Sequence, residues 1–437
     1  MPADPTGRAA ATEVLVRVSQ GQSLTAALGE SVDKLKDPRE RALARELCYG
    51  VMRWRPRLRA ITDQLLKKPL REKDADVSSL LLLGVYQLLH TRHPPHAAVA
   101  ETVAVADVRG KPWAKGLING VLRNFQRRRE EILAIVDRKA HVRLAHPRWL
   151  VAEIENAWPG DWERILEENN RQAPMVLRVN AKRISREDYL RRHPDLAAPV
   201  PGTETAARLF EARDVSRIPG FAEGIVSVQD AGAQFAADLL GLASGQRVLD
   251  ACAAPGGKSA HILEREPGAV LTAVEREAVR LTRTEETLRR LGLGAELVRA
   301  DAGSPDGWWN GQPFDRILLD VPCSGSGVIR RRPDIKFHRR PGDIDQYVAE
   351  QARLLNALWP LLVPGGLLLY VTCSVLPREN QQCIRRFLAE HPDARESLLD
   401  VDWGRADWGR GQQGPGRQIL PGENGMDGFF YARIEKR

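Results

Sequence analysis

Short apolar runs alternate with helical segments over the second half of the chain, and this alternation constrains the fold more than any other feature. Runs with the length and composition of buried strands occur at residues 247–251, 270–274, 295–300, 316–320 and 367–372. The segments between them space their apolar residues as helices do. Strands that alternate with helices build a mostly parallel sheet with helices on both faces. We therefore predict a C-terminal α/β domain with a Rossmann-like fold over residues 233–437.

Acidic residues stand at the C-terminal ends of three of these predicted strands. They are Glu275, Asp301 and Asp320. In open α/β sheets, ligands bind outside the carboxyl ends of the strands. Glu275 also lies 25 residues beyond Asp250, close to the spacing at which an acid in such folds binds ribose hydroxyls. We therefore expect a cofactor with a nucleoside part.

The loop after the first predicted strand joins small residues to the start of a helix. Small residues let the backbone approach a ligand, and a helix N-terminus offers unpaired N–H groups. The spacing matches neither the P-loop nor the G-x-G-x-x-G motif, so a generic strand–turn–helix is the alternative interpretation. We expect this loop to approach a ligand, and we call it the cofactor loop; its residues are Cys252, Ala253, Ala254, Pro255, Gly256, Gly257 and Lys258.

Two cysteines follow adjacent predicted strands of the same sheet. Cys323 lies in "DVPCSGSG" and Cys373 in "LYVTCSV", and a serine follows each of them. A thiolate near basic residues has a lowered pKa and is a strong nucleophile. A single cysteine in an α/β core is more often a small inert hydrophobe. Two thiols at one edge of a sheet favour a chemical role.

Positive charge is concentrated in the first third of the chain. Residues 1–145 hold 26 Lys and Arg against 16 Asp and Glu, a net charge of +10, whereas the remainder holds 39 against 41. Such an excess favours contact with a polyanion, most simply nucleic acid, and a solvated basic surface is the alternative. A second basic run, residues 328–340, carries six Lys and Arg against one Asp. The residues that we expect to contact nucleic-acid phosphates are Arg127, Arg128, Arg330, Arg331, Arg332 and Lys336.

The remaining sequence predicts two smaller domains before the sheet. Residues 1–145 space their apolar residues as an all-α unit, with breaks at glycine and proline. Residues 146–232 mix helical segments with the short β-prone runs "MVLRVN" and "IVSVQD", and we expect a small α+β domain of RRM-like type there. Cys48 and Cys383 fall on helical patterns and are expected to be core residues.

Composition excludes several classes of protein. No stretch approaches the ~18 apolar residues of a membrane span, and the N-terminal residues lack the layout of a signal peptide. The five cysteines include no CxxC pair, so neither a disulfide framework nor a zinc site is expected. We expect a cytoplasmic monomer that binds no metal and no membrane.

Three motifs resemble those of one enzyme family. "DACAAPGGKS", "DVPCSGSGVIRRRPDIKF" and "VTCSVLPREN" together resemble the S-adenosylmethionine-dependent RNA cytosine-5 methyltransferases of the NOL/NOP2/Sun type. The N-terminal helical region is similar to the NusB-like domain that bacterial 16S rRNA members of that family carry. The resemblance implies a NusB-like RNA-binding domain, S-adenosylmethionine as cofactor, and unassembled or early-intermediate 16S rRNA as partner.

The resemblance also assigns roles to residues. It implies that Cys373 attacks C6 of the target cytosine, that Cys323 assists product release, and that Asp320 hydrogen-bonds the cytosine edge. The cofactor loop, Glu275, Asp301 and Asp320 would hold S-adenosylmethionine. The family usually has aspartate where this chain has Glu275, so the hydroxyl contact would be one methylene longer.

Other functions remain open alternatives. Amino-directed nucleic-acid methyltransferases place an aromatic residue after a D-P-P or N-P-P turn, whereas this chain has "DVPCS". DNA cytosine-5 methyltransferases use the proline–cysteine thiol, here Cys323, and the second thiol at Cys373 favours the RNA type. A non-catalytic RNA-binding assembly factor, or a methyltransferase for another RNA, is the remaining alternative.

Overall fold

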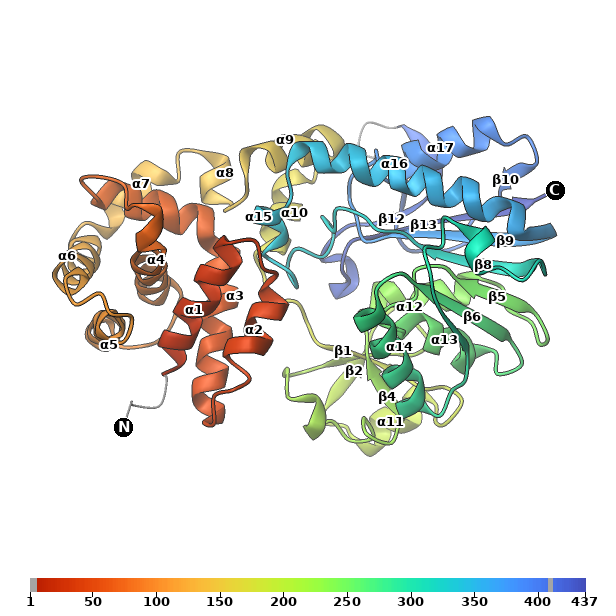
Figure 1. The fold of residues 1–437 in the computed structure, drawn as a ribbon, viewed down its shortest axis with the longest axis horizontal. Coiled ribbons are helices and arrows are strands. Elements are labelled where there is room, and N and C mark those ends of the chain that lie inside the picture. The colour runs from red at the N-terminus through yellow and green to blue at the C-terminus, as the bar shows by residue number, and fades with distance from the viewer. Residues whose placement is uncertain (1–5, 408–411) are drawn as a thin grey trace. The chain divides into compact units, whose positions relative to one another are not determined.

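A computed structural model describes residues 6–407 and 412–437. Their packing divides the chain into two compact units (Figure 1). The helical unit comprises the chain up to Ala152 together with Asn169–Arg171 and Ile329–Arg339. The sheet unit comprises Glu153–Glu168, Gln172–Val328 and Arg340–Arg437.

The first third of the described chain is helical, as the sequence predicts. Its helices are α1 (Gly7–Ser19), α2 (Leu24–Ser31), α3 (Pro38–Leu65), η1 (Glu72–Asp74), α4 (Ala75–His90), α5 (Pro95–Val108), α6 (Ala114–Arg127), α7 (Arg129–Val136) and α8 (Ala140–Arg143), followed by α9 (Arg148–Ala157) and α10 (Trp162–Asn169).

Local sequence signals start these helices, and burial of their apolar faces joins them. Thr6 caps α1, and Asp37 caps α3 ahead of a proline at the first helical position. One apolar core runs through the described helices from α1 to α8 and includes Cys48, which is fully buried. Helices α3 and α4 approach closely at Gly50, where a Cβ atom would lie 2.0 Å from the Tyr86 ring. The all-α prediction for this region is confirmed.

The segment Ile329–Arg339 belongs to the helical unit although it follows the fourth strand of the large sheet. Its short helix α15 (Ile335–His338) brings Lys336 into the interior, where the side chain is 1% exposed. Lys336 Nζ donates to Arg53 O (3.0 Å), Ala145 O (3.0 Å) and Asn170 Oδ1 (2.6 Å). Burial, assisted by the nearby Arg53, holds the pKa of Lys336 well below its usual value.

This placement corrects part of our expectation for RNA contacts. Lys336 Nζ already donates to three protein oxygens, and Arg330 is only 3% exposed. Neither side chain is therefore available to bind a phosphate. Arg127, Arg128 and Arg332 are exposed, and Arg331 is half-buried. Only these four stay among the predicted RNA contacts.

The middle region forms a four-stranded antiparallel sheet in the order β2-β3-β1-β4. Its elements are β1 (Val176–Val179), α11 (Arg186–Arg192), β2 (Ala197–Pro199), β3 (Ala206–Leu209), η2 (Val215–Arg217) and β4 (Val226–Val228). Strand β1 is central and buried along its whole length. The small α+β prediction is confirmed, with β1 and β4 at the two β-prone runs.

The large sheet has the order β11-β12-β13-β9-β8-β5-β6-β7, and β10 pairs with β13 (Figure 1). Its elements are α12 (Ala231–Leu239), β5 (Arg247–Asp250), α13 (Gly257–Arg265), β6 (Val270–Glu275), α14 (Ala278–Leu291), β7 (Glu296–Arg299), η3 (Pro305–Gly307), β8 (Phe314–Asp320), α16 (Pro341–Leu358), η4 (Trp359–Leu361), β9 (Leu362–Thr372), α17 (Gln381–Glu390), β10 (Ala394–Glu396), β11 (Arg405–Asp407), β12 (Gln413–Ile419), η5 (Glu423–Gly425) and β13 (Phe429–Lys436).

The five predicted strands are the parallel ones. Strands β5, β6, β7, β8 and β9 pair in parallel, which confirms the Rossmann-like fold. The last four strands are antiparallel and were not predicted.

Cys383 is buried on α17, as expected. None of the described helices is both long enough and apolar enough to cross a membrane.

Candidate active site

The cofactor loop lies between β5 and α13, and backbone hydrogen bonds fix both of its sides. Ala251 N donates to Leu318 O, and Ala253 N donates to Val274 O, both at 3.0 Å. Gly256 has φ +87°, and a Cβ atom there would lie 3.0 Å from Thr284 Cα. Glycine is therefore required at this turn. No side chain caps α13, so its first N–H groups face the loop as the sequence predicts.

Asp250, the last residue of β5, is a buried acid beside this loop. It is 1% exposed and accepts a hydrogen bond from Ser259 Oγ at 2.6 Å, while its other oxygen has no partner among the described residues. Burial, together with the charge of Asp320, raises the pKa of Asp250 to about 6, although the bond from Ser259 opposes the shift.

The raised pKa of Asp250 predicts a specific pH dependence of stability. Because the folded pKa of about 6 exceeds the unfolded value, the folded protein retains a proton between about pH 4 and pH 6 that the unfolded chain loses. Asp250 should therefore contribute a fall of about 3 kcal/mol in the free energy of unfolding as pH rises through that window. Burial also raises the pKa of Asp238 to about 6, so Asp250→Asn should make the fall smaller without abolishing it in urea unfolding experiments at pH 4.5 and 7. Asp306→Asn, at an exposed acid, should leave the fall at its wild-type size. Parallel curves for wild type and Asp250→Asn would contradict the prediction.

Lys258 and Asp320 form an ion pair at the carboxyl edge of the sheet. Lys258 Nζ lies 2.6 Å from Asp320 Oδ2, and the side chains are 14% and 28% exposed. Burial lowers the pKa of Lys258, but the charge and hydrogen bond of Asp320, with a smaller effect of Cys373, raise it above its usual value. The sequence placed both residues at the site but did not predict that they pair.

The other two acids also lie at strand ends. Glu275 is 5% exposed, accepts from Glu277 N at 3.0 Å and lies 3.5 Å from Arg280 Nη1. Asp301 accepts from Arg353 Nη2 at 2.9 and 3.1 Å and from Gly303 N. Burial raises the pKa of Asp301, but these hydrogen bonds outweigh it and the net shift is downward.

The two predicted thiols meet at the ends of neighbouring strands. Strands β8 and β9 pair in parallel, with Asp320 opposite Val371, so the loops that follow them emerge side by side. Cys323 Sγ lies 3.3 Å from Cys373 Sγ, and both residues are half-buried. The hydrogen bond with Cys373, together with burial, holds the pKa of Cys323 well above its usual value. A protonated thiol and a second sulfur therefore share one edge of the sheet.

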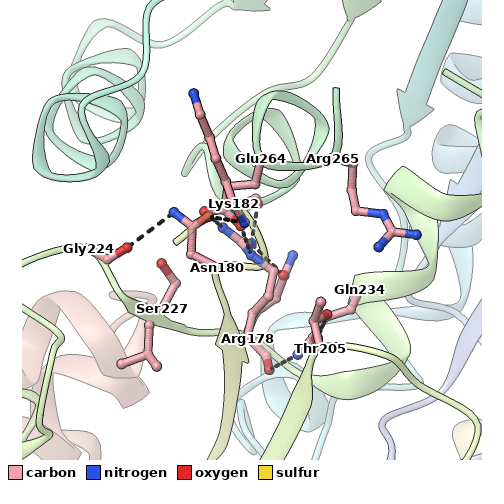
Figure 2. Close-up of polar contacts among 12 residues, drawn as sticks. Arg178, Asn180, Lys182, Thr205, Gly224, Ser227, Gln234, Glu264 and Arg265 are labelled. Carbon is pink, nitrogen blue, oxygen red and sulfur yellow. Dashed lines mark hydrogen bonds and ion pairs between the residues drawn. The ribbon is translucent and has the colours of Figure 1, made fainter. Parts of the chain in front are cut away.

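Sequence reasoning missed two buried residues that hydrogen-bond to the segments at this edge of the sheet. Arg178, on β1, has a fully buried side chain that donates twice to Glu264 on α13, each at 2.8 Å (Figure 2). Its Nη1 donates to Gly257 O and to Gln229 Oε1, both at 2.6 Å. The middle sheet is thereby tied to the first residue of α13. The only signal in the sequence was a charged residue inside the β-prone run "MVLRVN".

Glu379 is the second such residue. It follows the cysteine motif in "VTCSVLPREN" and is fully buried. Both serines that follow the cysteines hydrogen-bond its carboxylate.

The described residues contain no group of three or more His, Cys, Asp or Glu side chains arranged to hold a metal ion.

The fold and the site together define a class of protein. A Rossmann-like sheet with a glycine loop after its first strand, acids at its carboxyl edge and an antiparallel C-terminal strand is a methyltransferase fold, here with two thiols at the edge.

Comparison with known proteins agrees with that class. The family model described as "16S rRNA methyltransferase RsmB/F" matches residues 237–435, the NusB family model matches residues 5–127, and a ferredoxin-like domain model of RsmF/B-like methyltransferases matches residues 146–215. The chain belongs to the 16S rRNA methyltransferase RsmB/F family.

Individual relatives cover nearly the whole chain. Ribosomal RNA small subunit methyltransferase B of Pseudomonas putida is 51% identical over 434 residues, 98% of each chain. The protein of the same name from Vibrio cholerae is 46% identical over 98% of this chain and 97% of its own. A solved methyltransferase homologue from Pyrococcus horikoshii is 28% identical with a TM-score of 0.60, over 70% of this chain and 99% of its own.

Proposed function

We propose that this protein transfers a methyl group from S-adenosylmethionine to C5 of a cytosine in 16S rRNA, through a transient bond between Cys373 Sγ and C6. The observation that carries this proposal is the pair of thiols, 3.3 Å apart, beside the Lys258–Asp320 ion pair. The names of the relatives, which describe small-subunit rRNA methyltransferases, support the substrate.

The residues present fit S-adenosylmethionine. The uncapped start of α13 suits the carboxylate of the methionine part, and Glu275 at the end of β6 suits ribose hydroxyls. Asp301 keeps lone pairs beyond those that Arg353 and Gly303 use. Bound there, the cofactor supplies an electrophilic methyl group on a positively charged sulfur.

The chain's own residues then divide the work on the base. C5 of cytosine is a weak nucleophile, so Cys373 first adds its sulfur to C6, and the displaced electron pair makes C5 reactive. Asp320 gives one oxygen to Lys258 and offers the other to the cytosine edge. After transfer a base removes the C5 proton, and the electrons of that C–H bond restore the C5–C6 double bond and expel Cys373. Cys323, held as a thiol, assists this release.

The target base must leave its stack, because a stacked base hides the C6 face. We therefore expect a loop or loosely paired region of 16S rRNA that ribosomal proteins do not yet cover, bound by a monomer. The net charge of +10 over residues 1–145 and the exposed Arg127 and Arg128 support phosphate contacts by the helical unit.

Mapping of 5-methylcytosine in 16S rRNA tests the function. Cells that lack the protein should lose the modification at one site, and the wild-type gene should restore it. A gene that encodes Cys373→Ala should restore nothing. A modification pattern unchanged by loss of the protein would contradict the proposed function and favour the alternative of a non-catalytic RNA-binding assembly factor.

A further inference from the structure

The loops that carry the two thiols share one buried carboxylate. Glu379 Oε1 accepts from Ser324 N at 2.7 Å, and Oε2 accepts from Ser324 Oγ at 2.6 Å and from Ser374 Oγ at 2.5 Å. Ser324 directly follows Cys323, and Ser374 directly follows Cys373. A single side chain therefore bonds to the neighbour of each sulfur-bearing residue.

We propose that Glu379 is a positioning residue that fixes the spacing of Cys323 and Cys373. This inference rests on the proposed function, because it assigns Glu379 to the two thiols of that reaction. Glu379 is 0% exposed, so it acts through the serines and does not touch the substrate.

Neighbouring groups hold Glu379 in place. Its own carbonyl accepts from Tyr370 Oη at 2.7 Å, and the next residue, Asn380, donates to Ser374 O at 2.9 Å. From α16, Gln351 Nε2 donates both to Glu379 Oε1 at 3.2 Å and to Pro322 O at 3.0 Å. The carboxylate is thus anchored to β9, α16 and both thiol loops, so it cannot shift without moving them.

The chemistry of the pocket argues against a purely structural role. Burying a carboxylate costs several kcal/mol unless its oxygens are satisfied, and a side-chain amide of the same shape has only one accepting oxygen. What only a carboxylate supplies is two oxygens that accept from both loops at once, together with a negative charge. The pKa of Cys323 is raised mainly by its hydrogen bond with Cys373 and by burial, and the charge of Glu379 adds a smaller shift in the same direction.

Glu379→Gln removes the charge and keeps the shape, because the serine hydroxyls can rotate to meet an amide. We expect kcat for methyl transfer to fall by ~10²-fold, the cost of a thiol misplaced by about 1 Å, with little change in the KM for RNA. The apparent pKa of Cys323, measured as the pH dependence of its iodoacetamide alkylation by peptide mass spectrometry, should move downward. Glu390→Gln, at an exposed acid of α17, is the matched control and should change neither quantity.

Glu379→Asp is the second variant, and it decides the matter if Glu379→Gln does not fold. It keeps the charge but shortens the reach, so kcat should still fall because the two thiol loops lose their common spacing. Wild-type kcat and an unshifted profile in Glu379→Gln, or full activity in Glu379→Asp, would overturn the inference. If wild-type protein made no methylcytosine at all, the proposed function would fail, and the alkylation profiles would still report whether Glu379 acts on Cys323.

Discussion

Cys323→Ala is expected to accumulate a protein–RNA adduct that survives denaturation, whereas Cys373→Ala should form no adduct and no product. If Cys373 makes the bond to C6 and Cys323 assists its cleavage, loss of Cys323 stalls the reaction after methyl transfer. Loss of Cys373 removes the nucleophile, and removal of such a residue costs at least ~10⁴-fold in kcat. The measurement is a denaturing gel of 16S rRNA transcript, protein and S-adenosylmethionine, with the linked peptide identified by mass spectrometry.

The matched control for this pair is Cys383→Ala, which removes a buried thiol of α17 that lies outside the site. It should methylate RNA without accumulating the adduct. The reverse pattern, with the adduct in Cys373→Ala and none in Cys323→Ala, would exchange the roles of the two sulfurs. The absence of an adduct from every variant would argue against covalent catalysis as a whole.

Arg178→Met should cause the largest loss of stability. Glu264 is 2% exposed in its side chain and receives two hydrogen bonds from Arg178, so the substitution leaves a buried carboxylate unpaired. Such a change typically costs ~3–5 kcal/mol. Gly257 O and Gln229 Oε1 would lose their partner as well. The urea midpoint should fall, and amide hydrogen exchange in α13 should accelerate.

The double variant Arg178→Met, Glu264→Leu separates charge burial from packing. Replacing both partners of a buried ion pair by apolar residues is often neutral, so most of the lost stability should return. The bond to Gly257 O would still be missing, and we expect affinity for S-adenosylmethionine, measured by calorimetry, to stay below that of wild type. A double variant no more stable than Arg178→Met would show that the unpaired Glu264 carboxylate is not the source of the loss.

The sequence predicted the parallel half of the large sheet but not its antiparallel half. Strands β5 to β9 are apolar runs separated by helices or a long connection, and this alternation is readable without tertiary information. Strand β12 instead contains "GPG", residues that normally mark a turn. Strand β13 is buried at most of its positions, which removes the alternation that marks a half-exposed strand. Neighbouring strands, not local sequence, determine both.

The candidate site was predictable to a similar degree. Asp320, Cys323 and Cys373 were found because carboxyl ends of parallel strands share an edge, a rule that needs only strand positions. Asp320, Glu264 and Ser324, which pair with Lys258, Arg178 and Glu379, lie 62, 86 and 55 residues away from them. Nothing local marks such pairs, since a buried charge looks like a solvated one in sequence. For the same reason, the sequence predicted that Lys336 contacts a phosphate, whereas the side chain is buried in the core.

The segment Ile329–Arg339 has a consequence for how the protein is made. The helical unit needs this segment to complete its interior, because Lys336 bonds to Arg53 and Asn170, and Asp334 accepts from Leu24 N at 3.0 Å. At a translation rate of roughly 10 residues per second, these partners wait about 20 s after Ala152 for the segment to be synthesised. Until the chain beyond the loop that carries Cys323 has been made, the first third of the chain therefore lacks the partners of Leu24 N and Arg53 O.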